Sequence, residues 1–119
     1  MIEAAQIASL AESIAIAERA ELDLEVVAEA ITTGQAASPQ VVRNSRRMID
    51  GNHEENVVFT LTLRLKDVEY ALQFASTLGI GTPFGQLAAR QLRHLIDLGH
   101  TRANESKIIE VARLQPPAA

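Results

Sequence analysis

The first twenty residues constrain the fold most, because they contain neither Gly nor Pro and are dominated by Ala, Ile, Leu and Glu. Most of these are good helix formers and Ile is only somewhat weaker, so the stretch predicts a long helix over about residues 2–20. At helical spacing its apolar residues form two neighbouring rows, Ile7, Leu10, Ile14 and Ala17 in one and Ala4, Ala8, Ala11 and Ala15 in the other. So wide an apolar face is typical of a helix at the centre of a bundle or at a subunit interface.

The composition describes a single domain, residues 1–119, that needs no disulfide. A chain of 119 residues can bury roughly two thirds of the surface that it exposes when unfolded, and this one contains no Cys. Its net charge of −4 gives no reason to expect a nucleic-acid partner. No apolar run is long enough to span a membrane, and the N-terminus lacks the basic start of a signal peptide. We therefore expect a cytoplasmic protein that binds neither nucleic acid nor membrane.

Capping residues and glycines divide the remaining chain into five further helices. The pattern predicts helices over about residues 23–33, 39–49, 61–78, 83–98 and 104–114. The expected N-terminal caps are Ser38, Thr82 and the Asn104-Glu105-Ser106 cluster, and Asp23 is expected near the positive end of its helix. Residues 51–60 should be irregular, since the strand-like alternation over residues 57–63 has no second strand to pair with. The predicted fold class is therefore all-α, a single compact bundle of about six helices.

Few residues suggest chemistry. There is no Gly-rich phosphate loop and no Cys, and the three histidines, His53, His94 and His100, are too dispersed to share a helical face. We therefore predict no metal site and no catalytic residue within the chain. Three arginines, Arg43, Arg46 and Arg47, lie on one side of the helix over residues 39–49. A solvated helical face is the simpler interpretation of these arginines, and an anion contact is the alternative.

The dipeptide Lys66-Asp67 interrupts a densely apolar stretch early in the helix over residues 61–78. From spacing alone, the simpler interpretation is a solvated Lys66 with Glu69 as an exposed partner. The alternative is a functional role for this pair of charges in a helix that is otherwise central.

The order of several motifs resembles that of a known family. Lys66 and Asp67 belong to the run Leu65-Lys66-Asp67-Val68, which is followed by Ala71-Leu72, Ala75, Leu78-Gly79-Ile80 and Pro83. The Ala-rich opening with Glu12, the Ala17-Glu18-Arg19-Ala20 helix end, the Gly34 loop and the Leu98-Gly99-His100 stop complete the series. Together they resemble the C-terminal helical domain of the β-hydroxyacid dehydrogenases, typified by 3-hydroxyisobutyrate dehydrogenase and tartronate semialdehyde reductase. The resemblance covers nearly the whole chain and implies a fold like the 6-phosphogluconate dehydrogenase C-terminal domain.

The resemblance implies an oxidoreductase that uses NAD or NADP and acts on small β-hydroxyacids. In such enzymes an N-terminal Rossmann domain holds the cofactor, and the catalytic Lys and Asn would lie before Met1. We therefore expect the chain alone to be inactive and to bind neither cofactor tightly. Lys66 is the one residue that matches the family's cofactor and substrate contacts, where it reaches toward the nicotinamide end of the cleft. Asp67 matches the adjacent acid, which would make a structural bond.

The wide apolar face of the first helix also predicts a homodimer or higher oligomer. Within the family interpretation, the domain supplies dimerisation and the lid-side wall of the active site. The alternative hypothesis is a non-enzymatic helical oligomerisation module whose similarity to the family is confined to the pattern of a helical bundle.

Overall fold

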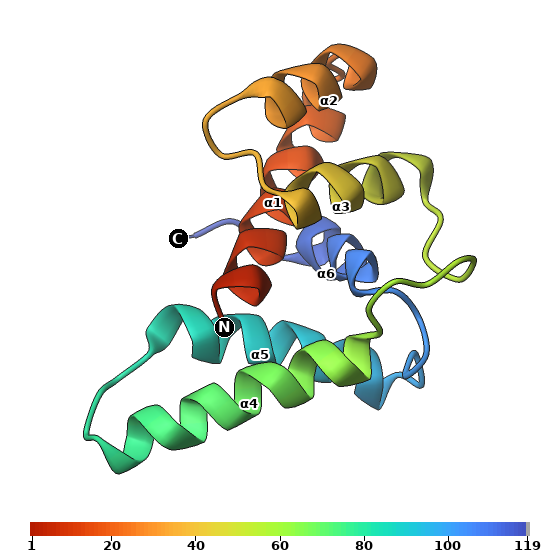
Figure 1. The fold of residues 1–119 in the computed structure, drawn as a ribbon. Helices are drawn as coiled ribbons and strands as arrows, with labels where there is room; N and C mark the ends of the chain where they lie inside the picture. The colour runs from red at the N-terminus through yellow and green to blue at the C-terminus, as the bar shows by residue number, and fades with distance from the viewer. Residues whose placement is uncertain (119) are drawn as a thin grey trace.

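The computed structural model describes residues 1–118 and consists of six α-helices and one short 3-10 helix (Figure 1). The elements are α1 (Ile2–Arg19), α2 (Leu24–Thr33), α3 (Pro39–Asp50), α4 (Leu61–Thr77), α5 (Pro83–Asp97), η1 (Glu105–Ile108) and α6 (Ile109–Leu114). The described residues contain no strand, and none of their helices is long and apolar enough to cross a membrane. The predicted all-α fold class is confirmed, and five predicted helices are present within a few residues of their expected bounds. The sixth, expected over residues 104–114, is divided into the 3-10 helix η1 and the shorter α-helix α6.

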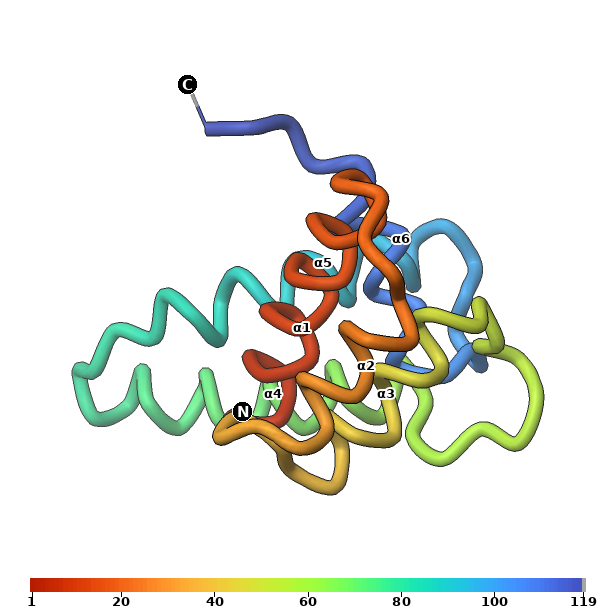
Figure 2. Tube along the Cα trace, turned by 90° about the horizontal axis from the view of Figure 1, so that it is seen from above, coloured from red at the N-terminus to blue at the C-terminus, as the bar shows by residue number. Residues whose placement is uncertain are grey.

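The first helix, α1, lies at the centre of the bundle, where α3, α5 and α6 pack around it (Figures 1 and 2). The predicted row of Ile7, Leu10, Ile14 and Ala17 is entirely buried. From the second row Ala4 and Ala11 are buried, whereas Ala8 and Ala15 are half-buried. Of the two places expected for this helix, the structure therefore shows the centre of the bundle, and other parts of the same chain cover its apolar face.

Side-chain caps begin three of the helices. Asp23 Oδ1 accepts a hydrogen bond from the Glu25 N–H at 3.0 Å, and Ser38 Oγ accepts from the Val41 N–H at 3.3 Å. Thr60 caps α4 in the same way. The expected cap at Thr82 is only partly correct, since Thr82 occupies the N-cap position of α5 but its hydroxyl makes no cap hydrogen bond. At α5 the first turn instead begins with a proline, whose missing N–H leaves one donor fewer to satisfy.

The expected cap at Asn104 is only partly correct, since Asn104 occupies the N-cap position of η1 but its side chain bonds to the preceding loop instead of the helix end. Asn104 Oδ1 accepts hydrogen bonds from the N–H groups of Val58 and Phe59, at 3.1 and 3.3 Å. One antiparallel bridge pairs Thr60 with Asn104. Buried backbone donors of an irregular segment need partners as much as those of a helix end do. Asn104 therefore anchors the irregular connection to η1, which is a 3-10 turn rather than the start of the α-helix.

Helices α4 and α5 form an antiparallel hairpin whose closed end projects from the rest of the bundle (Figures 1 and 2). Their close approach depends on Gly85, because a Cβ at this position would lie 2.9 Å from Leu72 Cδ2 and 2.7 Å from Met1 Sδ. The hairpin is thus packed tightly at its crossing with the N-terminus and extends away from the core beyond that crossing.

His53 is buried beside η1, with its Nδ1 2.8 Å from the hydroxyl of Ser106. Burial lowers the pKa of His53, and the positive charges of Lys107 and, more weakly, Arg113 act in the same direction. The carboxylates of Glu110 and Glu54 oppose the shift without cancelling it. The folded chain therefore holds His53 neutral at pH values where the unfolded chain protonates it.

We predict that the burial of neutral His53 does not reduce the free energy of unfolding above the ordinary histidine pKa of 6.5. Below that pH the free energy of unfolding decreases, because the unfolded chain binds a proton that folded His53 does not. One proton limits the slope to about 1.4 kcal/mol per pH unit. Urea unfolding between neutral and mildly acidic pH measures the slope. His53→Gln should flatten it, whereas His94→Gln, at an exposed position on α5, should leave it as in the wild type. An equal slope in the His53→Gln variant and the wild type would contradict the assignment.

Candidate functional site

Lys66 lies in the second turn of α4 and is exposed. Its Nζ is 5.7 Å from the centre of the Tyr70 ring, one turn further along the helix, which is a cation–π distance. The two residues help to form a surface hollow of about 330 Å³ between α4 and α5. Its lining comprises Thr62, Leu65, Lys66, Glu69, Tyr70, Gln73, Arg93 and Ile96.

The expected pairing of Lys66 with Glu69 is wrong. Glu69 instead forms an ion pair with Arg93 on α5, whose Nη2 lies 3.0 and 3.1 Å from the two carboxylate oxygens. Glu69 is thereby neutralised from the neighbouring helix. Among the described residues, no carboxylate forms an ion pair with Lys66. The ammonium group of Lys66 is therefore the uncompensated charge of the hollow, and its three donors can bind a carboxylate, a phosphate or a hydroxyl oxygen.

Asp67 makes the structural contact expected of it. Its Oδ2 lies 3.4 Å from Nη1 of Arg64, one turn earlier, and 4.0 Å from the amino group of Met1. The amino end of α1 thus meets the second turn of α4, which carries Lys66.

Beneath this surface, α4 is held by a buried ion pair that sequence analysis missed. Arg64 is only 1% exposed, and its Nε donates to Glu105 Oε2 at 2.6 Å. Its Nη1 donates to Glu3 Oε2 at 2.5 Å, and the guanidinium lies 4.1 Å above the centre of the Phe59 ring. One signal was available in the sequence, since Arg64 falls on the apolar face of its helix, three residues after Leu61.

The partners of Glu105 extend the network to α3. Its Oε1 accepts a hydrogen bond from Asn44 Nδ2 at 2.9 Å and lies 3.8 Å from Arg43 Nη2. Burial by itself lowers the pKa of Arg64, but the hydrogen bonds and charges of Glu105 and Glu3 outweigh it and raise that pKa. The network therefore connects α1, α3, α4 and η1 around one permanent charge and fixes the start of the helix that presents Lys66.

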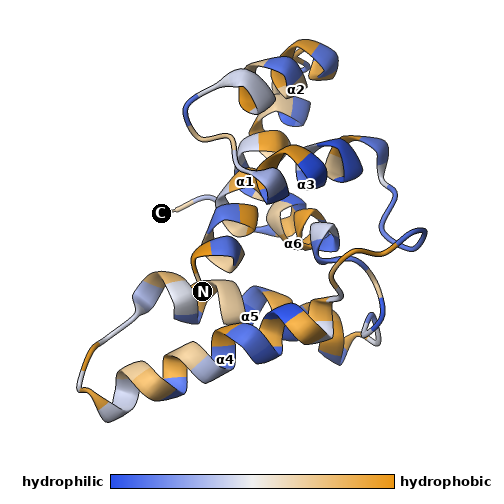
Figure 3. Ribbon diagram, viewed as in Figure 1, coloured by the Kyte–Doolittle hydropathy of each residue, from blue (hydrophilic) through white to orange (hydrophobic). Residues whose placement is uncertain are grey.

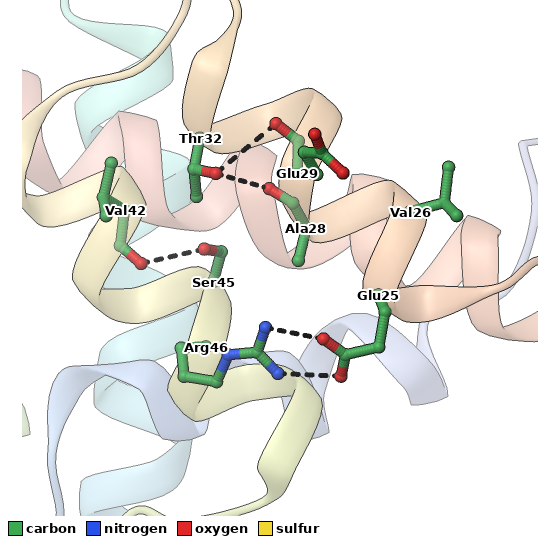
Figure 4. A pocket seen from close by; sticks show the side chains of 8 residues that line it. All are labelled: Glu25, Val26, Ala28, Glu29, Thr32, Val42, Ser45 and Arg46. Atoms are coloured by element: carbon green, nitrogen blue, oxygen red, sulfur yellow. Dashed lines mark hydrogen bonds and ion pairs between the residues drawn. The ribbon is translucent and has the colours of Figure 1, made fainter.

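The three arginines of α3 are all engaged within the chain. Arg46 donates two hydrogen bonds of 3.0 Å to the carboxylate of Glu25, across a surface hollow of about 470 Å³ between α2 and α3 (Figure 4). The hydrogen bond and charge of Arg46 lower the pKa of Glu25. Arg47 donates to backbone carbonyls of the following loop, including that of Glu55 at 2.8 Å. Arg43 lies 3.8 Å from the Glu105 carboxylate. Because each of the three arginines already contacts a carboxylate or backbone carbonyls of this chain, the structure favours the simpler interpretation over an anion contact.

The described residues also hold no cluster of three or more His, Asp or Glu side chains that could bind a metal ion. Lys66 is therefore the sequence-predicted residue that remains available for a ligand.

We predict that Glu105→Ala destabilises the chain by about 3 kcal/mol or more, because it leaves the buried guanidinium of Arg64 without its fully buried partner. Thermal or urea unfolding measures the loss. Glu25→Ala is the matched control, since it removes an exposed carboxylate from a two-hydrogen-bond pair with arginine and should change the midpoint far less. Equal losses in the two variants would show that burial does not distinguish these ion pairs.

Comparison with known proteins places these features in a family. Residues 1–112 match the family described as "NAD-binding of NADP-dependent 3-hydroxyisobutyrate dehydrogenase". A search of the curated proteins gave no match.

Several solved structures share the fold. A 3-hydroxyisobutyrate dehydrogenase from Salmonella typhimurium is 21% identical with a TM-score of 0.84, and the match covers 92% of this chain and 38% of that one. The enzyme of the same name from Mycobacterium tuberculosis, in a structure with L-serine, is 21% identical with a TM-score of 0.80, covering 95% and 40%. Psf3 in complex with NADP+ and 2-OPP is also 21% identical, with a TM-score of 0.76, covering 92% and 38%.

The chain thus spans about two fifths of the length of the solved structures that it matches. The structural matches establish a common fold, and the family model covers almost every residue. The chain therefore belongs to the β-hydroxyacid dehydrogenase family, through its match to the NAD-binding model of 3-hydroxyisobutyrate dehydrogenase.

Proposed function

We propose that residues 1–119 are the C-terminal helical domain of an NAD(P)-dependent β-hydroxyacid dehydrogenase. In this proposal the domain forms one wall of an active site completed by a Rossmann domain, and it assembles as a homo-oligomer. The nicotinamide cofactor supplies the hydride chemistry when bound. The contribution of this chain is to position ligand groups and to exclude water from one side of the cleft.

The observation that carries the proposal is the meeting of α1 and α4. The amino group of Met1 lies 4.0 Å from Asp67, the neighbour of Lys66. A family helix bearing the catalytic Lys and Asn, joined ahead of Met1, would therefore pass beside the second turn of α4. That arrangement would bring Lys66 to the same cleft as the reacting groups.

The described residues could contact one part of the NAD(P) cofactor, but they do not form a site for its pyrophosphate. The uncompensated ammonium of Lys66 suits a ribose hydroxyl, a phosphate or the substrate carboxylate. The described residues contain no strand, and hence no Gly-rich turn between a strand and a helix to receive a pyrophosphate. A contact from the Lys66 ammonium would stabilise the bound substrate and the transition state equally. We therefore expect Lys66 to affect KM more than kcat.

We predict that Lys66→Ala lowers the specificity constant kcat/KM by about ten- to hundred-fold in an active fusion. The fusion places a family Rossmann domain, with its catalytic Lys and Asn, ahead of Met1. The fall corresponds to losing one charge-assisted contact worth about 1.5–3 kcal/mol. Steady-state kinetics measures it, and most of the change should appear in KM.

Arg90→Ala is the matched control for this experiment, because it removes an exposed cation from α5 outside the Lys66 hollow. The melting temperature of both variants should stay near that of the parent fusion, since exposed charges contribute little to stability. If Lys66→Ala stays within about two-fold of an active parent fusion, Lys66 is an ordinary solvated lysine.

We also predict that the chain alone binds NAD and NADP only weakly. It offers no strand-loop-helix cradle among its described residues, and Arg46 is already paired with Glu25. Calorimetric titration at physiological salt tests this. A Kd at or below about 10 μM, roughly −7 kcal/mol of binding, would contradict the proposal that the cofactor is bound mainly by the Rossmann domain.

A further inference from the structure

We propose that His53, Ser106 and Asn104 form a proton-sensitive clasp, named here the His53 clasp. It holds the connection over residues 51–60 against η1 while the imidazole is neutral, and it releases the connection when the imidazole gains a proton. Through this connection the clasp positions the start of α4 and hence Lys66. Its effect on ligand binding rests on the proposed function, whereas the release itself does not.

The connection over residues 51–60 depends on His53 for its attachment. It is hydrophilic at its outer bend and becomes apolar only where it reaches α4 (Figure 3). His53 is the one buried side chain within residues 51–60, at 2% exposure, and the others are exposed or half-buried. A segment with so few buried contacts opens locally at a lower free energy than the core of the bundle unfolds. A change at His53 therefore acts on this segment before it acts on the rest of the chain.

Backbone hydrogen bonds join the connection to the segment that carries the rest of the clasp. The Asn104 N–H donates to the carbonyl of His53 at 2.7 Å, and the Glu105 N–H donates to that of Phe59 at 2.8 Å. Between these two points, Asn104 Oδ1 accepts from the N–H groups of Val58 and Phe59. Asn104 thus contacts the connection twice, through its backbone near His53 and through its side chain near α4.

The hydrogen bonds inside the clasp have one consistent direction. Asn104 Nδ2 donates to Ser106 Oγ at 2.9 Å and to Asn44 Oδ1 at 3.2 Å, so both of its hydrogens are used. Because Ser106 Oγ accepts from Asn104, its single hydrogen is free to donate to Nδ1 of His53, 2.8 Å away. Nδ1 of neutral His53 is therefore the acceptor at the end of this series. Ser106 is completely buried, so its hydroxyl has no access to water.

A proton on Nδ1 reverses the last of these hydrogen bonds. The imidazolium has two N–H donors and no acceptor, so Nδ1 then donates to Ser106 Oγ, which already accepts from Asn104. The hydroxyl hydrogen of Ser106 loses its acceptor, and a buried donor without a partner is unfavourable. Protonation therefore favours a state in which His53 and Ser106 reach water, which requires the connection to leave η1.

The charges around His53 give little support to an imidazolium. Those on the elements packed against this part of the connection are Glu54 of the connection itself, Lys107 of η1, Glu110 and Arg113 of α6, and Arg47 of α3. Lys107 Nζ holds both carboxylates, at 3.0 Å from Glu54 and 3.1 Å from Glu110. Burial is the main cause of the lowered pKa of His53, and the charge of Lys107 is the next. The closed connection therefore keeps the imidazole neutral.

Release of the connection reaches the Lys66 hollow through the first turn of α4. Arg64 Cζ lies 4.1 Å from the centre of the Phe59 ring, and Thr60 caps the helix by accepting from the Leu63 N–H at 3.1 Å. Both contacts come from the last residues of the connection. Their loss frees the turn that precedes Lys66, and a ligand then binds only the closed fraction of the chain.

Amide hydrogen exchange of the 119-residue chain, followed by NMR, tests the clasp. The intrinsic exchange rate at each pH divided by the observed rate gives a protection factor without the chemical effect of pH. We expect the Val58 and Phe59 amides to be about tenfold or more less protected than that of Ile14 in the core of α1. Their protection should fall about five- to tenfold between about pH 7.5 and pH 5.5, since the open connection binds one proton at the ordinary histidine pKa of 6.5.

His53→Gln should remove this fall, because glutamine accepts a hydrogen bond from Ser106 and does not titrate. His94→Gln, at an exposed position on α5, is the matched control and should keep the wild-type fall. If His53→Gln does not fold, the wild-type chain is sufficient. Its His53 ring signals and the amide shifts of Val58 and Phe59 should then titrate with one midpoint below pH 6.5.

Four results would overturn the clasp. They are protection at Val58 and Phe59 equal to that of Ile14 at both pH values, no fall in the wild type, a fall that survives in His53→Gln, and separate midpoints for the ring and the amides. The first would show that the connection opens only when the whole bundle unfolds. The other three would show that His53 does not control its release.

The active fusion with a Rossmann domain tests the link to Lys66. The ratio of the wild-type KM to the His53→Gln KM should rise between about pH 7.5 and pH 5.5 by the factor by which the closed fraction falls, while the kcat ratio stays constant. A closed fraction that falls while the KM ratio stays constant would overturn the link and leave the clasp intact. A Lys66→Ala fusion that behaves like its parent overturns the role proposed for Lys66 instead, and the exchange results stand in either case.

Discussion

The contact between the Arg64 guanidinium and the Glu105 carboxylate is the constraint on which the rest of the structure depends. Both side chains are almost fully buried, and a buried charge is tolerated only when its partners are complete. Completing them requires Glu3 from α1 and Asn44 from α3 to be in place as well. The ion pair thus contacts side chains of α1 and α3 and adds specific contacts to the apolar packing of these elements against η1 and α4. The register of α4, and with it the direction in which Lys66 points, follows from this network.

The helices could be predicted from the sequence, and the network that orders them could not. Ser38 caps α3 as predicted, and Asp23 lies at the start of α2 as predicted, because a residue at a helix start and the first turn that it contacts are neighbours in the sequence. Glu105 was assigned to a cap because its actual partner, Arg64, lies 41 residues away, and no local pattern specifies such a pairing. The consecutive burial of residues 103–109 has the same origin, since a 3-10 turn enclosed on all sides shows no amphipathic period. At the site, the motif led to Lys66, but the competition of Arg93 for Glu69 depends on how α5 lies beside α4.

Helix α4 combines two surfaces of opposite character along its length. Its first turns carry charges ordered by the buried network beneath them, and its last turns carry exposed rings with no charge nearby. Tyr70 stands where the two surfaces join, beneath the ammonium of Lys66 and at the edge of the uncharged stretch. Contacts made at the far end of the hairpin therefore lie within two or three helical turns of the proposed ligand hollow. Gly85 keeps the two helices close enough for the hairpin to behave as one rigid arm.

The burial of α1 against η1 and α6 has a consequence for the synthesis of the chain. Among the helices described here, α1 is synthesised first, yet it packs against η1 and α6, which follow all the others, and Arg113 on α6 pairs with Glu18 near the end of α1. At a translation rate of about 5–20 residues per second, several seconds pass between the synthesis of α1 and that of η1 and α6. The apolar rows of α1 are therefore only partly covered until η1 and α6 have been made, and a nascent chain stalled before residue 105 would leave part of them exposed to chaperones.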